Sequence, residues 1–303
     1  MTLILIIGVN QQAISYGEML YVPPEEHAEI ATSLNDVGKS FMISFASTGD
    51  LSDINMAISF YQEAVNLTPE GHVKKSVYLS DLGNTLRMGF ECTGDMADIR
   101  EAISVLRTAL HLISEGDPCM PECLSNLGCS FMQHFKYTGD MDDIDSAISA
   151  LKNAVDLTPE GHADKPTYLD ILGSSCMQHF EYSQEMVDIE KAISAQEQAV
   201  DLIPEGHADR PTYLSNLGVS FMHCFNHTGE MADIGKAISV QEQAVDLIPE
   251  GHAGRPIYLS NLGFHSHVAL NAQERWLTLR RPFLLKKRQL ISFQKVMLAN
   301  PHI

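Results

Sequence analysis

The feature that most constrains this chain is an internal repeat of 45 residues. Six glycines mark the period, each 45 positions after the last: Gly38, Gly83, Gly128, Gly173, Gly218 and Gly263. The repeat is almost literal near its end, where the segment Ala192 to Gly218 and its successor, Ala237 to Gly263, differ at three positions. A period of this length without drift is typical of solenoids, in which each unit packs against its neighbours. We therefore predict an elongated repeat array.

Each unit is predicted to contain two helices, and the third copy shows the first of them. Its large apolar residues recur at i, i+3, i+7 and i+11: Leu124, Leu127, Phe131 and Phe135. At about 100° per residue this spacing keeps them on one side of a helix. We expect the helix to begin near Pro121, where a missing N–H is harmless, and to end at Thr138-Gly139, because glycine readily adopts a left-handed turn.

The second helix of the unit is predicted to follow at once. Asp140 and Asp143 resemble an acidic capping box, with both carboxylates near the free N–H groups of a helix start. The inward face is then formed by Ile144, Ala147, Ile148, Leu151, Ala154 and Val155. Pro159 ends the helix, and Gly161-His162 lies in the connecting turn. The predicted fold class is all-α, a right-handed α-α superhelix of helix-turn-helix repeats.

The period also divides the chain. We predict a degenerate partial repeat over 1–27, a solenoid of five full repeats and a partial sixth over 28–267, and a basic tail without repeats over 268–303. The sixth copy starts a helix from about Arg255 to Phe264, and the pattern then fails at Asn271 to Glu274. The tail either binds an acidic groove or an anionic surface, serves as a localisation signal, or is non-native sequence from an error in gene prediction.

Charge narrows the classes of partner. The formal net charge is -19, and residues 1–267 alone carry 13 basic and 38 acidic side chains. Such a body repels phosphate backbones and anionic lipid surfaces, so we expect neither a nucleic acid nor a membrane as partner, and favour a basic or apolar peptide or protein. The apolar start, Met1 to Val9, is too short for a membrane span and lacks the basic flank of a signal peptide. We expect a cytoplasmic protein, with the nucleus as alternative, and reduced cysteines.

The repeated columns resemble the tetratricopeptide repeat (TPR). The family's Leu-Gly pair falls on Leu82-Gly83, with large residues at Leu79 and Leu86. Its small-large-small-proline series in the second helix falls on Ala57, Tyr61, Ala64 and Pro69. The 45-residue unit is a long variant, similar to kinesin-light-chain-type repeats and to expanded arrays of fungal proteins. Ser114 departs from the pattern, as do Gln196 and Gln241 at the large position, which leaves the local packing there open.

The resemblance implies that the first helices line a concave surface that binds extended peptides. The matching stripe lies about 80 to 180° from the core stripe, and it predicts a peptide-binding set: Lys39, Met42, Asn84, Arg87, Ser125, Cys129, Met132, Gln133, Ser174, Met177, Gln178, Ser215, Met222 and His223. Methionines recur in this set and suggest an adaptable apolar strip for a ligand. The alternative is that they fill the contact between neighbouring units.

No catalytic or metal site is predicted, and no cofactor. The histidines at 72, 162, 207 and 252 recur in the Glu-Gly-His turn, at least one unit apart, so they lie too far from one another to share an ion and are expected to stabilise turns. His134, His179 and Cys224 share another column and face the same objection. The sequence offers no nucleophile motif or phosphate loop.

These observations favour a non-enzymatic protein-interaction scaffold. One alternative is the regulatory arm of a larger enzyme, such as one with a caspase-like protease domain, whose catalytic part is absent from this chain. Another is self-assembly, because both ends of the array expose repeat faces that could stack end to end.

Overall fold

The structure is a computed structural model that describes residues 26–274, and within this range the regular elements are helices. They are α1 (His27–Thr48), α2 (Leu51–Leu67), α3 (Lys75–Thr93), α4 (Met96–Leu112), α5 (Met120–Thr138), α6 (Met141–Leu157), α7 (Lys165–Ser183), α8 (Met186–Leu202), α9 (Arg210–Thr228), α10 (Met231–Asp246) and a last helix over 255–274. The predictions for the degenerate partial repeat and for most of the basic tail fall outside the described residues.

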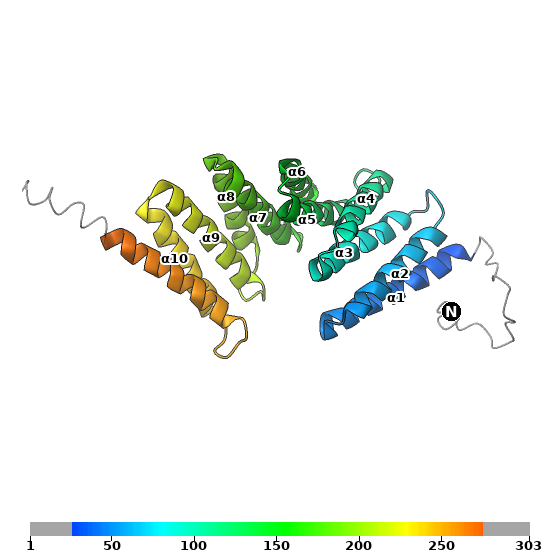
Figure 1. Ribbon diagram of the computed structural model, residues 1–303, viewed down its shortest axis with the longest axis horizontal. Coiled ribbons are helices and arrows are strands. Elements are labelled where there is room, and N and C mark those ends of the chain that lie inside the picture. The colour runs from blue at the N-terminus through cyan, green and yellow to red at the C-terminus, as the bar shows by residue number, and fades with distance from the viewer. Residues whose placement is uncertain (1–25, 275–303) are drawn as a thin grey trace, which may run out of the picture.

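The helices form hairpins that stack in chain order. Each odd-numbered helix packs most extensively against the even-numbered helix that follows it, and each hairpin contacts the next. Figure 1 shows the result as an arc, with α4, α6 and α8 on its outer side and α3, α5 and α7 on its inner side. The predicted all-α solenoid is thereby confirmed. The first helix of each unit faces the hollow of the arc.

The turn between the paired helices follows the expected chemistry with one correction. Gly139 has φ 69° and donates its N–H to Phe135 O, and the Asp140 carboxylate caps α6 by accepting from Asp142 N at 3.1 Å. Asp143 does not complete a capping box. Instead the Thr138 hydroxyl accepts the Asp140 N–H at 3.2 Å and lies 3.3 Å from Asp143 Oδ2. Because Thr138 Oγ1 already accepts the N–H of the N-cap residue Asp140, the Asp143 carboxylate accepts a hydrogen bond from the Thr138 hydroxyl instead.

In the fourth unit a residue other than glycine occupies this left-handed turn. Gln184 has φ 57° and stands where Gly139 and its counterparts stand in the other units; it is the one non-glycine residue with positive φ in the described range. We expect Gln184→Gly to raise the free energy of unfolding by about 0.5–1 kcal/mol, because a Cβ is strained in this conformation. Gly139→Gln should lower it by a similar amount. Urea denaturation of both variants measures the two changes. If both substitutions change the free energy of unfolding in the same direction, the argument is contradicted.

The repeated glycines hold the two helices of each unit close together. A Cβ on Gly128 would lie 2.6 Å from Leu151 Cγ, and one on Gly83 would lie 2.5 Å from Leu106 Cγ. We call this contact, the glycine of the first helix against one side chain of the second, the glycine socket. It explains why small residues recur there, since a helix pair can approach this closely only where one partner has no side chain.

Two sockets hold the glutamines that departed from the expected pattern. Gln196 and Gln241 are both fully buried. Gln196 Oε1 accepts a hydrogen bond from Ser220 Oγ at 2.6 Å, and Gln241 Nε2 donates to Ser215 Oγ at 3.2 Å. Both partners lie on α9. These polar partners offset part of the cost of burying the two amides, although Gln241 Oε1 is buried without a partner among the described residues.

The last helix is longer than predicted. It continues to residue 274 instead of ending near Phe264. No glycine or proline interrupts 265–274, and Val268, Ala269 and Ala272 pack against the cluster formed by α9 and α10. The expected end rested on the loss of the repeat pattern. Helix propensity and tertiary contacts extend the helix without that pattern.

Candidate binding surface

Side chains of the first helices meet across unit boundaries on the inner side of the arc. Asn216 Nδ2 on α9 donates to Asp170 Oδ2 on α7 at 2.9 Å, and Gln133 Nε2 on α5 donates to Glu91 on α3 at 2.8 Å. Lys39 of α1 lies 3.4 Å from Asp81 of α3. We call the side chains at these positions of α1, α3, α5, α7 and α9 the inner face. It is a polar surface that runs from unit to unit.

The fourteen residues predicted to bind a ligand differ in accessibility. Lys39 is exposed. Nine are partly exposed: Met42, Asn84, Arg87, Cys129, Met132, Gln133, Ser174, Gln178 and His223. Four are buried: Ser125, Met177, Ser215 and Met222. All fourteen lie on first helices, and ten of them have accessible surface.

The methionines of the predicted set differ in exposure: Met177 and Met222 are buried, whereas Met42 and Met132 are partly exposed. Met177 and Met222 belong to apolar clusters in the core, and Met222 is 3% exposed. Met132 Sδ accepts from Ser175 Oγ at 2.7 Å, across the boundary between α5 and α7. Their positions agree with the alternative stated from sequence, in which methionine fills the contact between units. Met177 and Met222 cannot form part of an apolar strip at the surface, because the neighbouring unit covers them.

Several polar atoms on the inner face lie buried without a hydrogen-bond partner among the described residues. Three are acceptors: Asn35 Oδ1, Asp170 Oδ1 and Gln178 Oε1. The fourth, Arg87 Nε, is a donor. Leaving such groups unpaired costs roughly 1–3 kcal/mol each. Gln241 Oε1 of α10 and His265 Nδ1 of the last helix are unpaired too, but the four inner-face atoms all come from first helices and most of them are acceptors.

Asp170 is the most unusual of these groups. It is 8% exposed, and within residues 26–274 its side chain is bonded on one carboxylate oxygen, by the Asn216 amide. Burial raises the pKa of Asp170 to about 7, and the Asn216 hydrogen bond only partly opposes this rise. The same column holds Ser125 and Ser215 in the adjacent units. An ionisable group at this position is therefore a property of the fourth unit.

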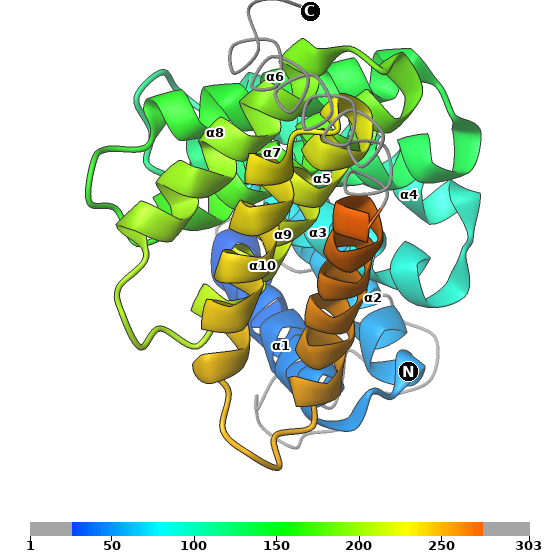
Figure 2. The same cartoon turned by 90° about the vertical axis from the view of Figure 1, so that its left-hand side faces the viewer.

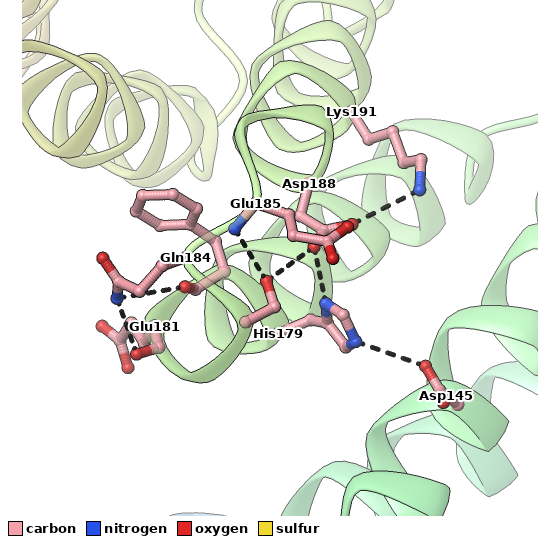
Figure 3. A network of polar contacts seen from close by, with 9 residues as sticks. Asp145, His179, Glu181, Gln184, Glu185, Asp188 and Lys191 are labelled. Carbon is pink, nitrogen blue, oxygen red and sulfur yellow. Dashed lines mark hydrogen bonds and ion pairs between the residues drawn. The ribbon is translucent and has the colours of Figure 1, made fainter. Parts of the chain in front are cut away.

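A polar network around His179 joins α6, α7 and α8 (Figure 3). His179 Nδ1 lies 2.7 Å from Asp188 Oδ2, which also accepts from Ser183 Oγ at 2.8 Å, and Lys191 Nζ lies 3.3 Å from Asp188 Oδ1. On its other side His179 Nε2 is 3.4 Å from Asp145. Burial alone would raise the pKa of Asp188, but the bonds from Ser183 and His179 lower it below its ordinary value.

This network joins the starts and ends of neighbouring helices. The Ser183 hydroxyl donates to the Asp188 carboxylate, whose pKa is lowered, so this carboxylate is a weak base toward the hydroxyl proton. The same contact recurs in other units, where His134 Nδ1 lies 2.6 Å from Asp143 Oδ2 and Cys224 Sγ lies 3.3 Å from Asp233 Oδ2. The column of His134, His179 and Cys224 thus contacts the start of the second helix in the third, fourth and fifth units.

The remaining histidines and cysteines have structural environments. His162 and His207 each accept a hydrogen bond at Nδ1 from the backbone N–H two residues later, at 3.3 and 3.2 Å, which confirms the predicted role in the turn. All six cysteines are free, and burial raises the pKa of Cys176 to about 11. Within 26–274 no three metal-binding side chains gather at one point. No helix of the described range is long and apolar enough to cross a membrane.

Two cavities between successive turns were not predicted from the sequence. One, of about 430 Å³, lies between the turns that precede α5 and α7, and the other, of about 500 Å³, lies one unit further on. Their walls include equivalent residues, His162 with Asp164 and His207 with Asp209. The regular spacing of the Pro-Glu-Gly-His turn was the available indication. The periodicity could not show that adjacent turns leave space between them.

Comparisons with protein-family models and with curated proteins found no match to this chain. Experimentally determined structures do match. A thermophilic TPR protein of Thermus thermophilus is 16% identical, with 77% of this chain and 98% of that chain covered at a TM-score of 0.51. A Podosopora anserina protein described as a kinesin light chain with nearly identical TPR-like repeats is 12% identical, with 75% and 97% covered at a TM-score of 0.54. The fold is that of a TPR array. The resemblance drawn from the repeated columns is thereby confirmed for the fold.

The TPR units of this chain differ from one another at positions of the inner face. The socket glycine is retained in every unit, while the residue after it is different each time: Lys39, Asn84, Cys129, Ser174, Val219 and Phe264. Residues that hold a TPR hairpin together must repeat because every hairpin has the same geometry. Positions free of that requirement can vary, and on the first helices they lie on the inner face.

Proposed function

We propose that this protein is a non-enzymatic interaction scaffold whose inner face binds an extended segment of a partner protein. The observation that carries the proposal is the row of polar side chains on α1, α3, α5, α7 and α9, which is partly accessible and changes composition from unit to unit. A surface of this kind offers each successive part of a ligand a different set of contacts. Such variation provides specificity along an extended chain.

The unpaired acceptors support a ligand rich in hydrogen-bond donors. Asp170, Asn35 and Gln178 each hold a shielded oxygen without a partner among the described residues. A ligand would reach the oxygen of a side chain such as Gln178 after rotation of the side-chain amide. Backbone N–H groups of an extended segment have no hydrogen-bond acceptor within the segment itself. By donating to these oxygens they would pair both the ligand's donors and the protein's acceptors.

Charge favours a basic segment over an acidic one. The inner-face cations are already engaged, because Lys39 lies 3.4 Å from Asp81 and Arg87 bonds to Glu91. Asp170 is bonded instead to a neutral amide, and no cationic side chain of residues 26–274 pairs with it. With residues 1–267 strongly acidic as well, an incoming lysine or arginine meets a favourable potential.

The proposal is tested with a displayed library of random twelve-residue peptides selected on the full chain. Binders should lose at least tenfold in affinity to the double variant Gln133→Ala and Gln178→Ala, since both amides lie on inner helices α5 and α7. The matched control is Gln198→Ala with Gln243→Ala, which removes two amides from outer helices α8 and α10. Fluorescence anisotropy measures the affinities.

Two results would overturn the proposal. One is a set of selected peptides that bind equally to both double variants, and the other is peptides that lose affinity to the outer variant alone. Circular dichroism of both variants confirms that helical content is retained. Selected sequences enriched in acidic residues would contradict the charge argument while leaving the location of the site intact.

A further inference from the structure

The last helix exposes residues in columns that most preceding first helices bury. Leu214 is 2% exposed in α9, whereas Leu259, one repeat later, is 46% exposed. Phe225 is 8% exposed, whereas Leu270 in the same column is 60% exposed. Both columns face the second helix of their own unit in the earlier copies. The described residues of the sixth unit contain a first helix without its second helix.

The glycine socket of this helix is empty as well. A Cβ on Gly218 would lie 2.9 Å from Gln241 Oε1, but a Cβ on Gly263 would meet nothing within 4 Å. Figure 2 looks onto this end of the array, where the last helix is drawn in orange. Ser266 lies one turn further along the same side and is half-buried. We call Leu259, Gly263, Ser266 and Leu270 the terminal face.

The sequence that follows the last helix departs from the repeat at the columns of a second helix. At the alanine column, 45 residues after Ala237, the sequence has Pro282, and at the socket position, 45 residues after Gln241, it has Lys286. A proline inside a helix removes a hydrogen bond and costs about 3 kcal/mol. A lysine in the socket would place its charge between two helices. The repeat pattern therefore does not encode its usual partner for the terminal face.

The terminal face is complementary to itself. If two copies of the last helix lie antiparallel about a two-fold axis between residues 264 and 265, Leu259 of one faces Leu270 of the other, and Gly263 faces Ser266. Small residues at the centre permit close approach of the helix axes, and leucines cover both ends. The same axis generates both contacts twice, as an isologous interface requires.

We propose that two copies of this chain associate through the terminal face, with their last helices antiparallel. This association is independent of the inner face, which remains open in both copies. One pair of helices buries less surface than the roughly 800 Å² per partner of a standard interface. A dimer that dissociates in the micromolar range is expected. It should strengthen as salt screens the repulsion between two acidic bodies.

Sedimentation equilibrium of the full chain from about 1 to 100 μM tests the association. We expect a monomer–dimer equilibrium, weakened roughly a hundredfold or more by Leu270→Glu because the substitution places two carboxylates in one interface. Ile43→Glu is the matched control. Ile43 is 70% exposed on α1, at the other end of the array, and its substitution should leave the equilibrium unchanged.

Crosslinking tests the antiparallel geometry. A mixture of Leu259→Cys and Leu270→Cys chains should form a disulfide-linked dimer on mild oxidation, more than either variant alone, and the unsubstituted chain gives the background from its native cysteines. A monomer at every concentration would overturn the proposal. So would a dimer that survives Leu270→Glu, whatever the effect of Ile43→Glu, or preferential crosslinking of Leu259→Cys with itself.

Discussion

Gly128→Ala is expected to lower the free energy of unfolding by about 2–3 kcal/mol, although alanine is the better helix former. The added methyl group would lie 2.6 Å from Leu151 Cγ, and Leu151 is itself fully buried. Neither helix of the pair can move to make room for this methyl group without losing packing contacts with the adjacent unit. Denaturant unfolding followed by circular dichroism measures the change.

Gly235→Ala provides the control with the opposite sign. Gly235 lies within α10 and is exposed, and a Cβ at this position would meet no atom within 4 Å. The substitution should raise the free energy of unfolding by about 0.5–1 kcal/mol through helix propensity alone. If both glycines respond in the same direction, the close approach of the paired helices is not what selects glycine in the socket.

Asp170→Asn is expected to stabilise the protein at pH 8 by about 2–4 kcal/mol and to have little effect below pH 4. The pKa of Asp170 is raised to about 7 from an ordinary value of 3.8. Between these values the folded protein keeps a proton that the unfolded chain releases. Stability contributed by the protonated group is therefore complete below about pH 4 and falls as pH rises toward 7. Asparagine mimics the protonated carboxyl and removes this loss.

The measurement is urea denaturation at pH 4, 6 and 8 for both proteins. Asp201→Asn, at an exposed position of α8, is the matched control and should show no such difference between pH 4 and 8. A stabilisation by Asp170→Asn that is constant with pH would show that the carboxyl is not neutral in the folded protein. The peptide proposal is affected too, because a basic ligand would favour the ionised form.

Local chemistry made much of the fold predictable. Each first helix ends where a glycine such as Gly139 takes the left-handed conformation, and each second helix ends before a residue such as Pro159. These signals act within a few residues, so they can be read without knowing the rest of the chain. The length of the last helix could not be predicted in this way, because contacts of Val268 and Ala269 with the preceding unit support it.

The candidate site was predictable only as a side of the first helices. Helical spacing placed Gln133, Gln178 and Met177 beside the core stripe, and the structure leaves the two glutamines partly exposed but buries the methionine. The difference between an accessible glutamine and a buried methionine depends on how far each hairpin rotates against the next. That rotation results from many contacts between units, so it cannot be predicted from a short-range sequence pattern.

The sequence alone therefore determined the repeat, the two helices in each unit and the residues that join them, because periodicity and turn chemistry are local. Tertiary structure decided which inner-face side chains are exposed, which acceptors such as Asp170 Oδ1 are left unpaired, and that Gly263 has no neighbour in its socket. Each of these depends on what the adjacent unit covers. The physical reason is that burial in a solenoid is a property of two stacked units, whereas the repeat describes one.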